Sequence, residues 1–415
     1  KVSDLIFWGG GELLKDYTNK LSLWYWAFKL TVLRGANKNI FGFFQGIGPT
    51  KGALSQSLIA YTANRTRGFS VRDAESKEKL DAWGVRVPVV ASYDPAVWCQ
   101  APTAAEGVRV AREYSAQIGL DASFFHDFAG FGIRRWFHYR PGGFLPAKMR
   151  FWRSSSRVSA KERAYIQQLA DMADSIIELR DVNLVFFPMH VAASENDAAF
   201  ANAVVAKMQH GWRTHVIVED TLSPADFLAL LGRSRFFVAS RLHSAILATV
   251  AAVPAYCLYY VDKGRLFFEQ LGLQEFSAKI DETLSPETAK EVTRSILKLT
   301  DISGVVRNVQ VRGVQVMREA IYNDFFVLLA EKLAKPRSVS EELAARRLAS
   351  MGAREKAAPT YFGKGEKQAK AKARAAAKTG GAAKSAKPAA KAAPAKAVTK
   401  GSTKPAAKSA KSTKK

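Results

Sequence analysis

Apolar runs and helical stretches alternate along the first 95 residues of this 415-residue chain, and this alternation limits the possible folds more than any other feature. Short apolar runs that end in glycine, proline or charged residues predict buried strands, and the longer stretches between them predict helices. The predicted strands cover residues 5–8, 39–44, 68–71 and 87–91, and the predicted helices cover about residues 21–33, 50–65 and 74–83. Strands separated by single helices indicate a parallel sheet with crossover helices.

A second alternating series begins near residue 130, after a predicted connecting helix and linker over residues 104–121. Its predicted strands cover residues 131–133, 183–187, 215–218, 236–239 and 255–260, and its predicted helices cover residues 161–179, 197–209, 225–231 and about 310–333. The sequence therefore predicts an α/β protein with two Rossmann-like lobes that face a cleft. We expect an N-terminal lobe over residues 1–120, a C-terminal lobe with a closing helix over residues 121–335, and a tail over residues 336–415.

The tail is a polycation. Residues 354–415 contain 18 Lys or Arg and two Glu, a net charge of +16, which leaves +9 of the total +25 for residues 1–353. Because it has almost no apolar side chain larger than Ala, we predict that it is disordered. Such a tail binds nucleic acid, acidic polysaccharide or anionic lipid through charge, or serves as a solubilising appendage without a dedicated partner.

The cysteine content and the hydropathy of the chain indicate the cellular compartment of the protein. Cys99 and Cys257 show no spacing typical of zinc sites or disulfide frameworks, which favours a reducing compartment. No apolar stretch reaches the ~18 residues that can span a bilayer. We therefore expect a cytoplasmic protein that can also bind peripherally at the inner face of the membrane. The chain begins with Lys1 almost directly before a strand, and we expect that its natural amino terminus has been shortened.

Arg241 and His243 stand between a predicted buried strand and an apolar helix that begins near Ser244. Open α/β folds bind ligands at the carboxyl ends of their strands, and a helix N-terminus there favours an anion. Arg offers a fork to carboxylate or phosphate, and His can move a proton near neutral pH. The pattern predicts proton-transfer chemistry on an anionic substrate, with a helix cap or a packing pair as the structural alternative.

Seven short motifs, each weak alone, occur in order over residues 5–273. They are Trp8-Gly9-Gly10-Gly11-Glu12-Leu13-Leu14, Gln45-Gly46-Ile47-Gly48-Pro49, Val71-Arg72-Asp73-Ala74-Glu75-Ser76, Asp94-Pro95-Ala96, Phe187-Pro188-Met189, Ser240-Arg241-Leu242-His243-Ser244 and Tyr260-Val261-Asp262-Lys263. Together they resemble the polysaccharide pyruvyl transferase family. The resemblance implies a GT-B-like fold and transfer of pyruvate from phosphoenolpyruvate to two sugar hydroxyls as a cyclic ketal, in exopolysaccharide or cell-envelope biosynthesis. It implies phosphoenolpyruvate as co-substrate, an acceptor sugar that a lipid can carry, and no bound cofactor or metal.

The resemblance also implies roles for individual residues. His243 would transfer protons, while Arg241 and Lys263 would hold the phosphate or carboxylate of the donor. Arg72 and Arg134 would be further clamps, and Arg135 could replace Arg134. For Arg72 the structural alternative is an ion pair with Asp73 at a helix start, and for Lys263 it is a solvated side chain.

Three glycines and one histidine complete the predicted site. Gly9, Gly10 and Gly11 allow close approach of a ligand to the backbone, although a tight turn needs glycine equally. His190 is a candidate acceptor-binding group or a half-buried packing residue.

An aromatic and basic segment over residues 124–153 stands apart from these motifs. Its part over residues 137–153 could stack on sugar rings or dock at an anionic membrane, or bury its aromatic side chains on the lobe. Two other functions fit the same sequence. One is a nucleotide-sugar glycosyltransferase that uses the same cleft, and the other is an inactive member that binds polyanions through its tail.

Overall fold

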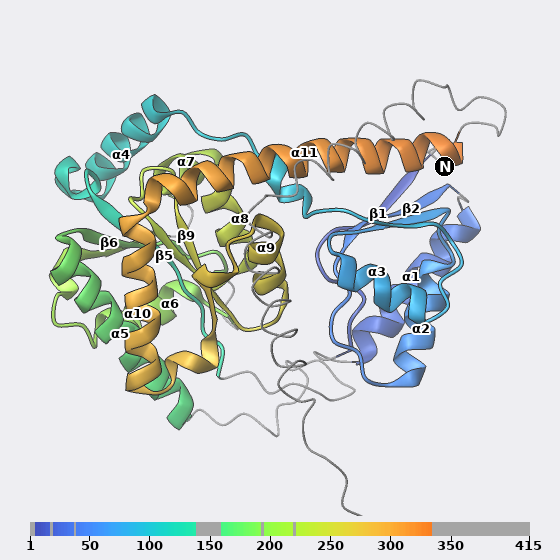
Figure 1. The fold of residues 1–415 in the computed structure, drawn as a ribbon, viewed down its shortest axis with the longest axis horizontal. Coiled ribbons are helices and arrows are strands. Elements are labelled where there is room, and N and C mark those ends of the chain that lie inside the picture. The colour runs from blue at the N-terminus through green and yellow to red at the C-terminus, as the bar shows by residue number, and fades with distance from the viewer. Residues whose placement is uncertain are drawn as a thin grey trace, which may run out of the picture. The chain divides into compact units, whose positions relative to one another are not determined.

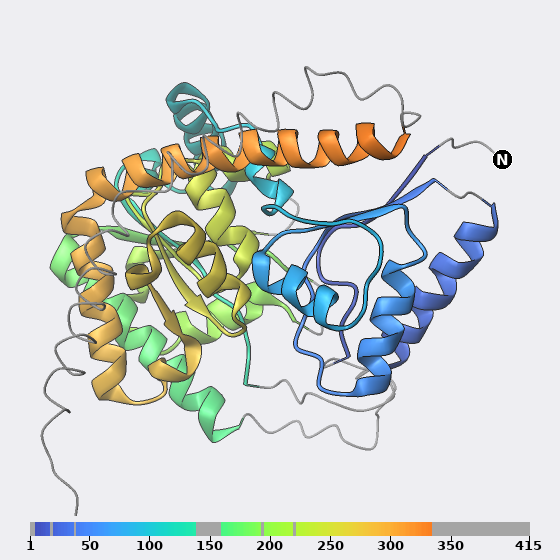
Figure 2. The same cartoon turned by 45° about the vertical axis from the view of Figure 1, so that its right-hand side comes forward.

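The structure, a computed structural model, describes residues 5–16, 20–36, 39–137, 159–191, 195–218 and 221–333. The chain divides into two units, Lys1–Phe362 and Gly363–Lys415, and all described residues belong to the first unit. The predicted disordered tail and nearly all of the segment over residues 137–153 lie outside the described residues. Figures 1 and 2 show the described helices and strands in two orientations.

The first sheet has four parallel strands within the described residues, in the order β1-β2-β3-β4. Its strands are β1 (Ile6–Gly9), β2 (Ile40–Gln45), β3 (Gly68–Val71) and β4 (Val89–Ala91), and its crossover helices are α1 (Lys20–Ala36), α2 (Ala53–Ala63) and α3 (Ala74–Ala82). Asp73 caps α3 by accepting a hydrogen bond from the backbone N–H of Ser76. Leu23, Ile40, Ile59 and Phe69 are buried in the core of this sheet.

The second sheet has six parallel strands within the described residues, in the order β10-β9-β8-β5-β6-β7. The strands are β5 (Phe128–Gly132), β6 (Asn183–Phe186), β7 (Thr214–Val216), β8 (Phe237–Ala239), β9 (Ala255–Tyr259) and β10 (Ser277–Lys279). In chain order this is the 3-2-1-4-5-6 arrangement of the Rossmann fold, whose direction of winding reverses between β5 and β8. The predicted α/β class with two parallel Rossmann-like sheets is therefore confirmed.

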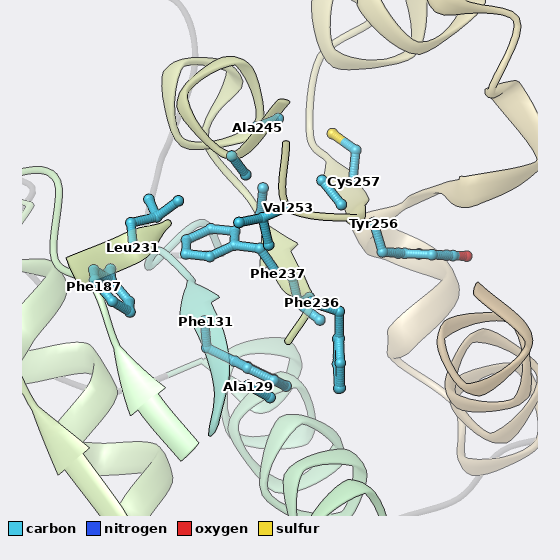
Figure 3. Close-up of a cluster of buried hydrophobic side chains, with 14 of the residues drawn as sticks. Ala129, Phe131, Phe187, Leu231, Phe236, Phe237, Ala245, Val253, Tyr256 and Cys257 are labelled. Atoms are coloured by element: carbon cyan, nitrogen blue, oxygen red, sulfur yellow. The ribbon is translucent and has the colours of Figure 1, made fainter. Parts of the chain in front are cut away.

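The α-helices that follow β4 complete the core of the second sheet. They are α4 (Ala104–Ile118), α5 (Ala160–Arg180), α6 (Asp197–Val205), α7 (Pro224–Leu231), α8 (Leu242–Val250), α9 (Lys263–Leu271), α10 (Pro286–Asp301) and α11 (Ser303–Leu333). Short 3-10 helices are η1 (Pro95–Trp98), η2 (Ala122–Phe125), η5 (Gly211–Arg213), η6 (Gln274–Phe276) and η7 (Ile280–Thr283). Phe131, Phe187 and Phe237 lie in the buried cluster of this sheet (Figure 3).

Several elements differ from their sequence predictions. Strand β5 begins at Phe128 rather than at residue 131, and α9 and β10 were not predicted. The closing helix begins at Ser303 rather than near residue 310, and α10, which the sequence prediction omitted, comes directly before it. The domain boundary at residue 120 stays a prediction. Helix α4, which precedes it, packs on α7 and contributes Val110 and Tyr114 to the core of the second sheet. Within the described part, no helix is both long and apolar enough to cross a membrane.

Helix α11 packs against both sheets. It contacts α8 and α9 of the second sheet, and Phe325 near its end lies 5.4 Å from Phe7 and 5.3 Å from Phe43 between ring centroids. Phe325 is only 5% exposed and also lies 5.3 Å from Phe44, which is 1% exposed, whereas Phe7 is 48% exposed. The helix therefore links the core of the second sheet to strands β1 and β2.

We expect Phe325→Ala to lower the free energy of unfolding by about 3–5 kcal/mol, because the truncation leaves a cavity among buried aromatic rings. Urea denaturation followed by circular dichroism measures this change. Phe326→Ala is the matched control, since Phe326 is 49% exposed and its truncation leaves no buried cavity. Equal losses for both variants would contradict the role given to Phe325.

Candidate active site

The point where strand order reverses carries two of the predicted arginines. Arg134 follows β5 and Arg241 follows β8, and these strands are neighbours in the sheet. Arg134 Nη2 lies 2.8 Å from Glu195 Oε2, and Arg241 Nη2 lies 3.3 Å from the same oxygen. Burial alone would raise the pKa of Glu195, but the two arginines hold that pKa below its ordinary value. Both predicted cations therefore converge on one carboxylate.

The guanidinium of Arg241 also binds a second carboxylate, that of Asp197. Its Nε and Nη2 donate to the two oxygens of Asp197 at 2.7 and 2.8 Å, and Asp197 is 1% exposed. Burial is the largest single effect and works to lower the pKa of Arg241, but the hydrogen bonds and charge of Asp197, together with Tyr260 and Glu195, raise the pKa. The Nη1 amine takes part in none of these bonds. Arg241 is thus rigidly placed, with one amine left for an anion.

Arg72 and Asp94 form a buried ion pair after strands β3 and β4. Arg72 Nη1 donates to Asp94 Oδ2 at 2.5 Å, and their side chains are 6% and 7% exposed. Gly46, after β2, makes room for this arginine, because a Cβ there would lie 2.7 Å from Arg72 Nε. The predicted alternative, a pair between Arg72 and Asp73, is wrong, since the partner of Arg72 is Asp94 and Asp73 caps α3.

His243 lies in the first turn of α8, with its Nε2 3.9 Å from Asp94 Oδ2. The side chain is 55% exposed, yet the surrounding protein lowers the pKa of His243 by partial burial. The negative charge of Asp94 opposes this effect. The pKa of His243 is lowered further by three cations, namely Arg72, Lys263 and Arg241. At pH 7 the imidazole is therefore mostly neutral and surrounded by positive charge.

Lys263 begins α9, and its ammonium lies 3.7 Å from Glu12 Oε2 and 6.0 Å from the ring centre of Tyr260. Its side chain is 25% exposed, so the solvated alternative does not describe it. One pocket is lined by residues that include Glu12, Gly46, Arg72 and Lys263. A second pocket shares Arg72 and Lys263 and adds Asp94 and Leu242. The two cations thus line both pockets.

The glycine turn after β1 serves two purposes. Gly9, Gly10 and Gly11 have φ values of +139°, +81° and +73°, which side-chain-bearing residues rarely adopt. A Cβ on Gly9 would overlap Gln45, so this position is required by the tight turn. Cβ atoms on Gly10 and Gly11 would meet open space, and these two glycines can admit a ligand to the backbone.

Arg135 and His190 stand apart from the group around His243. Arg135 pairs with Glu162 in the first turn of α5 through its Nε and Nη2, which gives it a structural partner away from Glu195. His190 acts electrostatically on Glu195, and its Nδ1 is buried without a hydrogen bond among the described residues.

Four carboxylates belong to the site, although the prediction assigned them no role. They are Glu12, Asp94, Glu195 and Asp197. Asp94 could have been found, because it lies only three residues after the predicted strand that ends at residue 91 and begins one of the seven motifs. Within the described residues, no group of three or more His, Cys, Asp or Glu side chains is arranged to hold a metal ion.

A family model described as polysaccharide pyruvyl transferase matches residues 2–262, which include every residue of the site before Lys263. The chain belongs to the polysaccharide pyruvyl transferase family. Members of this family are transferases that act on a sugar or polysaccharide acceptor. No curated protein sequence matches the chain significantly.

Solved structures similar to this member of the family include sugar-nucleotide enzymes. A UDP-forming α,α-trehalose-phosphate synthase from Burkholderia xenovorans is 11% identical, with 77% of this chain and 73% of that chain covered and a TM-score of 0.47. A UDP-GlcNAc 2-epimerase from Methanocaldococcus jannaschii is 10% identical, with coverage of 69% and 76% and a TM-score of 0.38. The likeness is distant.

Asp94 raises the pKa of His243, so Asp94→Asn is expected to lower that pKa further. The carbon-bound proton signals of the imidazole, followed by NMR across a pH titration, give the pKa directly. Asp262→Asn is the control, because Asp262 has no such effect on His243 and is 62% exposed. An unchanged or raised pKa in Asp94→Asn would contradict the geometry described.

Proposed function

We propose that the protein transfers the pyruvyl group of phosphoenolpyruvate to two hydroxyls of a sugar in a polysaccharide or a lipid-linked glycan, forming a pyruvate ketal. The observation that carries this proposal is the position of His243 beside Asp94 and among Arg72, Lys263 and Arg241. Phosphoenolpyruvate brings a phosphate and a carboxylate, and several fixed cations suit such a donor. No bound cofactor is needed for this chemistry.

The four cations differ in how available they are to bind phosphoenolpyruvate. Lys263 lies 3.7 Å from Glu12 and lines both pockets, so it can bind an incoming phosphate while Lys15 stays paired with Glu12. Arg72 remains paired with Asp94 and offers its remaining N–H groups to the pockets that it lines. Arg241 offers Nη1, while Arg134 holds Glu195 in place and lies 4.3 Å over the ring of Tyr260. We therefore assign direct contacts to Arg72, Lys263 and Arg241, and a positioning role to Arg134.

The chemical steps need one proton donor and a later acceptor. Binding of the anionic donor raises the pKa of His243, and the imidazolium gives its proton to the methylene carbon, which becomes a methyl group. The adjacent carbon gains cationic character, and a sugar hydroxyl attacks it and loses its proton. The bond to phosphate then breaks, and the second hydroxyl attacks the same carbon and loses its proton. One proton of the two hydroxyls leaves with phosphate, and the other restores His243.

Replacement of His243 by Ala is expected to reduce acceptor-dependent phosphate release from phosphoenolpyruvate by about 10²–10⁴-fold, because proton transfer to carbon loses its donor. The assay uses acceptors that contain galactose, mannose or N-acetylmannosamine. His126→Ala is the control, since His126 is exposed at the end of η2 and is not one of the residues assigned to the site. Transfer from a UDP-sugar, with no response to phosphoenolpyruvate in release or thermal stability, would instead support a nucleotide-sugar glycosyltransferase.

The pH dependence follows from the charge around His243. In the free enzyme its pKa is lowered, so kcat/KM is expected to fall as the pH rises through that lowered pKa. Bound phosphoenolpyruvate adds negative charge and raises the pKa, so the alkaline fall of kcat is expected at a higher pH. Steady-state rates, corrected for ionisation of free phosphoenolpyruvate, test this order. A fall of kcat at the same or a lower pH would contradict His243 as the proton donor.

A further inference from the structure

Helix α1 (Lys20–Ala36) has an aromatic surface where a helix packed on a sheet ordinarily has a polar one. Its inner face buries Leu23, Ala27 and Leu30 in the core of the first sheet. Its outer face carries large apolar side chains with exposed fractions of 46% to 69%. They are Trp24, Tyr25, Phe28 and Val32. Contiguous apolar surface of this kind marks a binding site for a partner or a membrane.

The aromatic surface continues onto α2 (Ala53–Ala63), which packs beside α1 (Figures 1 and 2). Leu54 at its start is 69% exposed, and Tyr61 near its end is 41% exposed. The guanidinium of Arg65 stacks 4.3 Å from the ring centre of Tyr61 and donates to its hydroxyl at 2.6 Å. We call these six exposed side chains on α1 and α2, together with the cations beside them, the α1–α2 face.

Positive charge predominates on the α1–α2 face. The sequence contains no Asp or Glu between Asp16 and Asp73, and this interval includes both helices. Exposed lysines stand among the aromatic side chains, and Lys29 Nζ lies 5.1 Å from the ring centre of Trp26. Lys20 and Lys51 are exposed as well. Neither helix contributes a carboxylate, although Asp16 lies beside Gly52 at the start of α2. A surface on which cations predominate attracts a partner that is densely negative.

We propose that the α1–α2 face docks the protein on an anionic lipid bilayer. Trp, Tyr and Phe side chains gain most at the boundary between headgroups and acyl chains, and lysines beside them pair with anionic headgroups. A sugar ligand would account for the aromatic rings but not for the cations that stand beside them. Because the inner side of α1 is fixed on the sheet, the helix lies along the bilayer surface rather than across it.

A probe at Phe28 tests this contact at one position in the full chain. Phe28→Cys carries an NBD fluorophore in a Cys99→Ser background, since Cys99 is exposed and Cys257 is buried. Vesicles contain equal parts of phosphatidylglycerol and phosphatidylcholine, and no phosphoenolpyruvate is added, so the outcome is independent of the proposed transfer. Trp212→Cys with the same label is the control, because Trp212 is 78% exposed and lies on η5.

We expect a blue shift and a rise of emission at position 28 and neither change at position 212. Absence of a change at position 28 while the protein sediments with the vesicles would overturn the proposal, because another part of the chain would then make the contact. Equal changes at both positions would also overturn it.

A second variant measures the contribution of the aromatic side chains to binding. Trp24→Ser combined with Phe28→Ser is expected to weaken partition onto the anionic vesicles by about tenfold or more at high salt, where charge attraction is screened. Trp212→Ser is the matched control and should partition like the parent chain. Unchanged partition of the double variant would contradict the proposal. Loss of a dimer in the double variant, without vesicle binding by the parent, would assign the face to a second copy of the chain.

Discussion

The site depends on pairing each cation with a carboxylate, because otherwise this much positive charge could not gather around one histidine. Four pairs achieve this among the described residues. They are Arg72 with Asp94, Arg134 with Glu195, Arg241 with Asp197, and Lys263 with Glu12. The pairs differ in strength. The tight, buried ones fix geometry, and the long pair of Lys263 leaves a cation that an anionic substrate can recruit.

The fold brings these groups together without requiring any of them to be near in sequence. Each cation follows the carboxyl end of a parallel strand or starts the helix after it, and those ends share one edge of each sheet. The winding reverses between β5 and β8, and the loops after these two strands bring Arg134 and Arg241 to the same carboxylate, that of Glu195. Asp94 acts on both Arg72 and His243, so one carboxylate couples groups from the two sheets.

Sequence alone predicted the described strands except β10, because the others end in residues that cannot continue a buried strand, whereas β10 is only three residues long. It also placed Arg72, His243 and Lys263 correctly at strand ends. It could not choose between Arg134 and Arg135, since adjacent residues leave a strand in different directions and only packing shows that Arg135 turns to Glu162. The partners Glu195 and Asp197 were missed because pairs across distant loops leave no local pattern. Helix α10 did carry a readable start, with Ser285 as its cap and Pro286 in its first turn.

The central claim is that an exchangeable proton from the protein converts the methylene of phosphoenolpyruvate into the methyl group of a ketal. NMR of the sugar product formed in D₂O tests it most directly. The account predicts a pyruvate ketal whose methyl group carries one deuterium, formed together with inorganic phosphate. A sugar product without a pyruvyl group, or phosphoenolpyruvate that stays intact while the acceptor is modified, would contradict it.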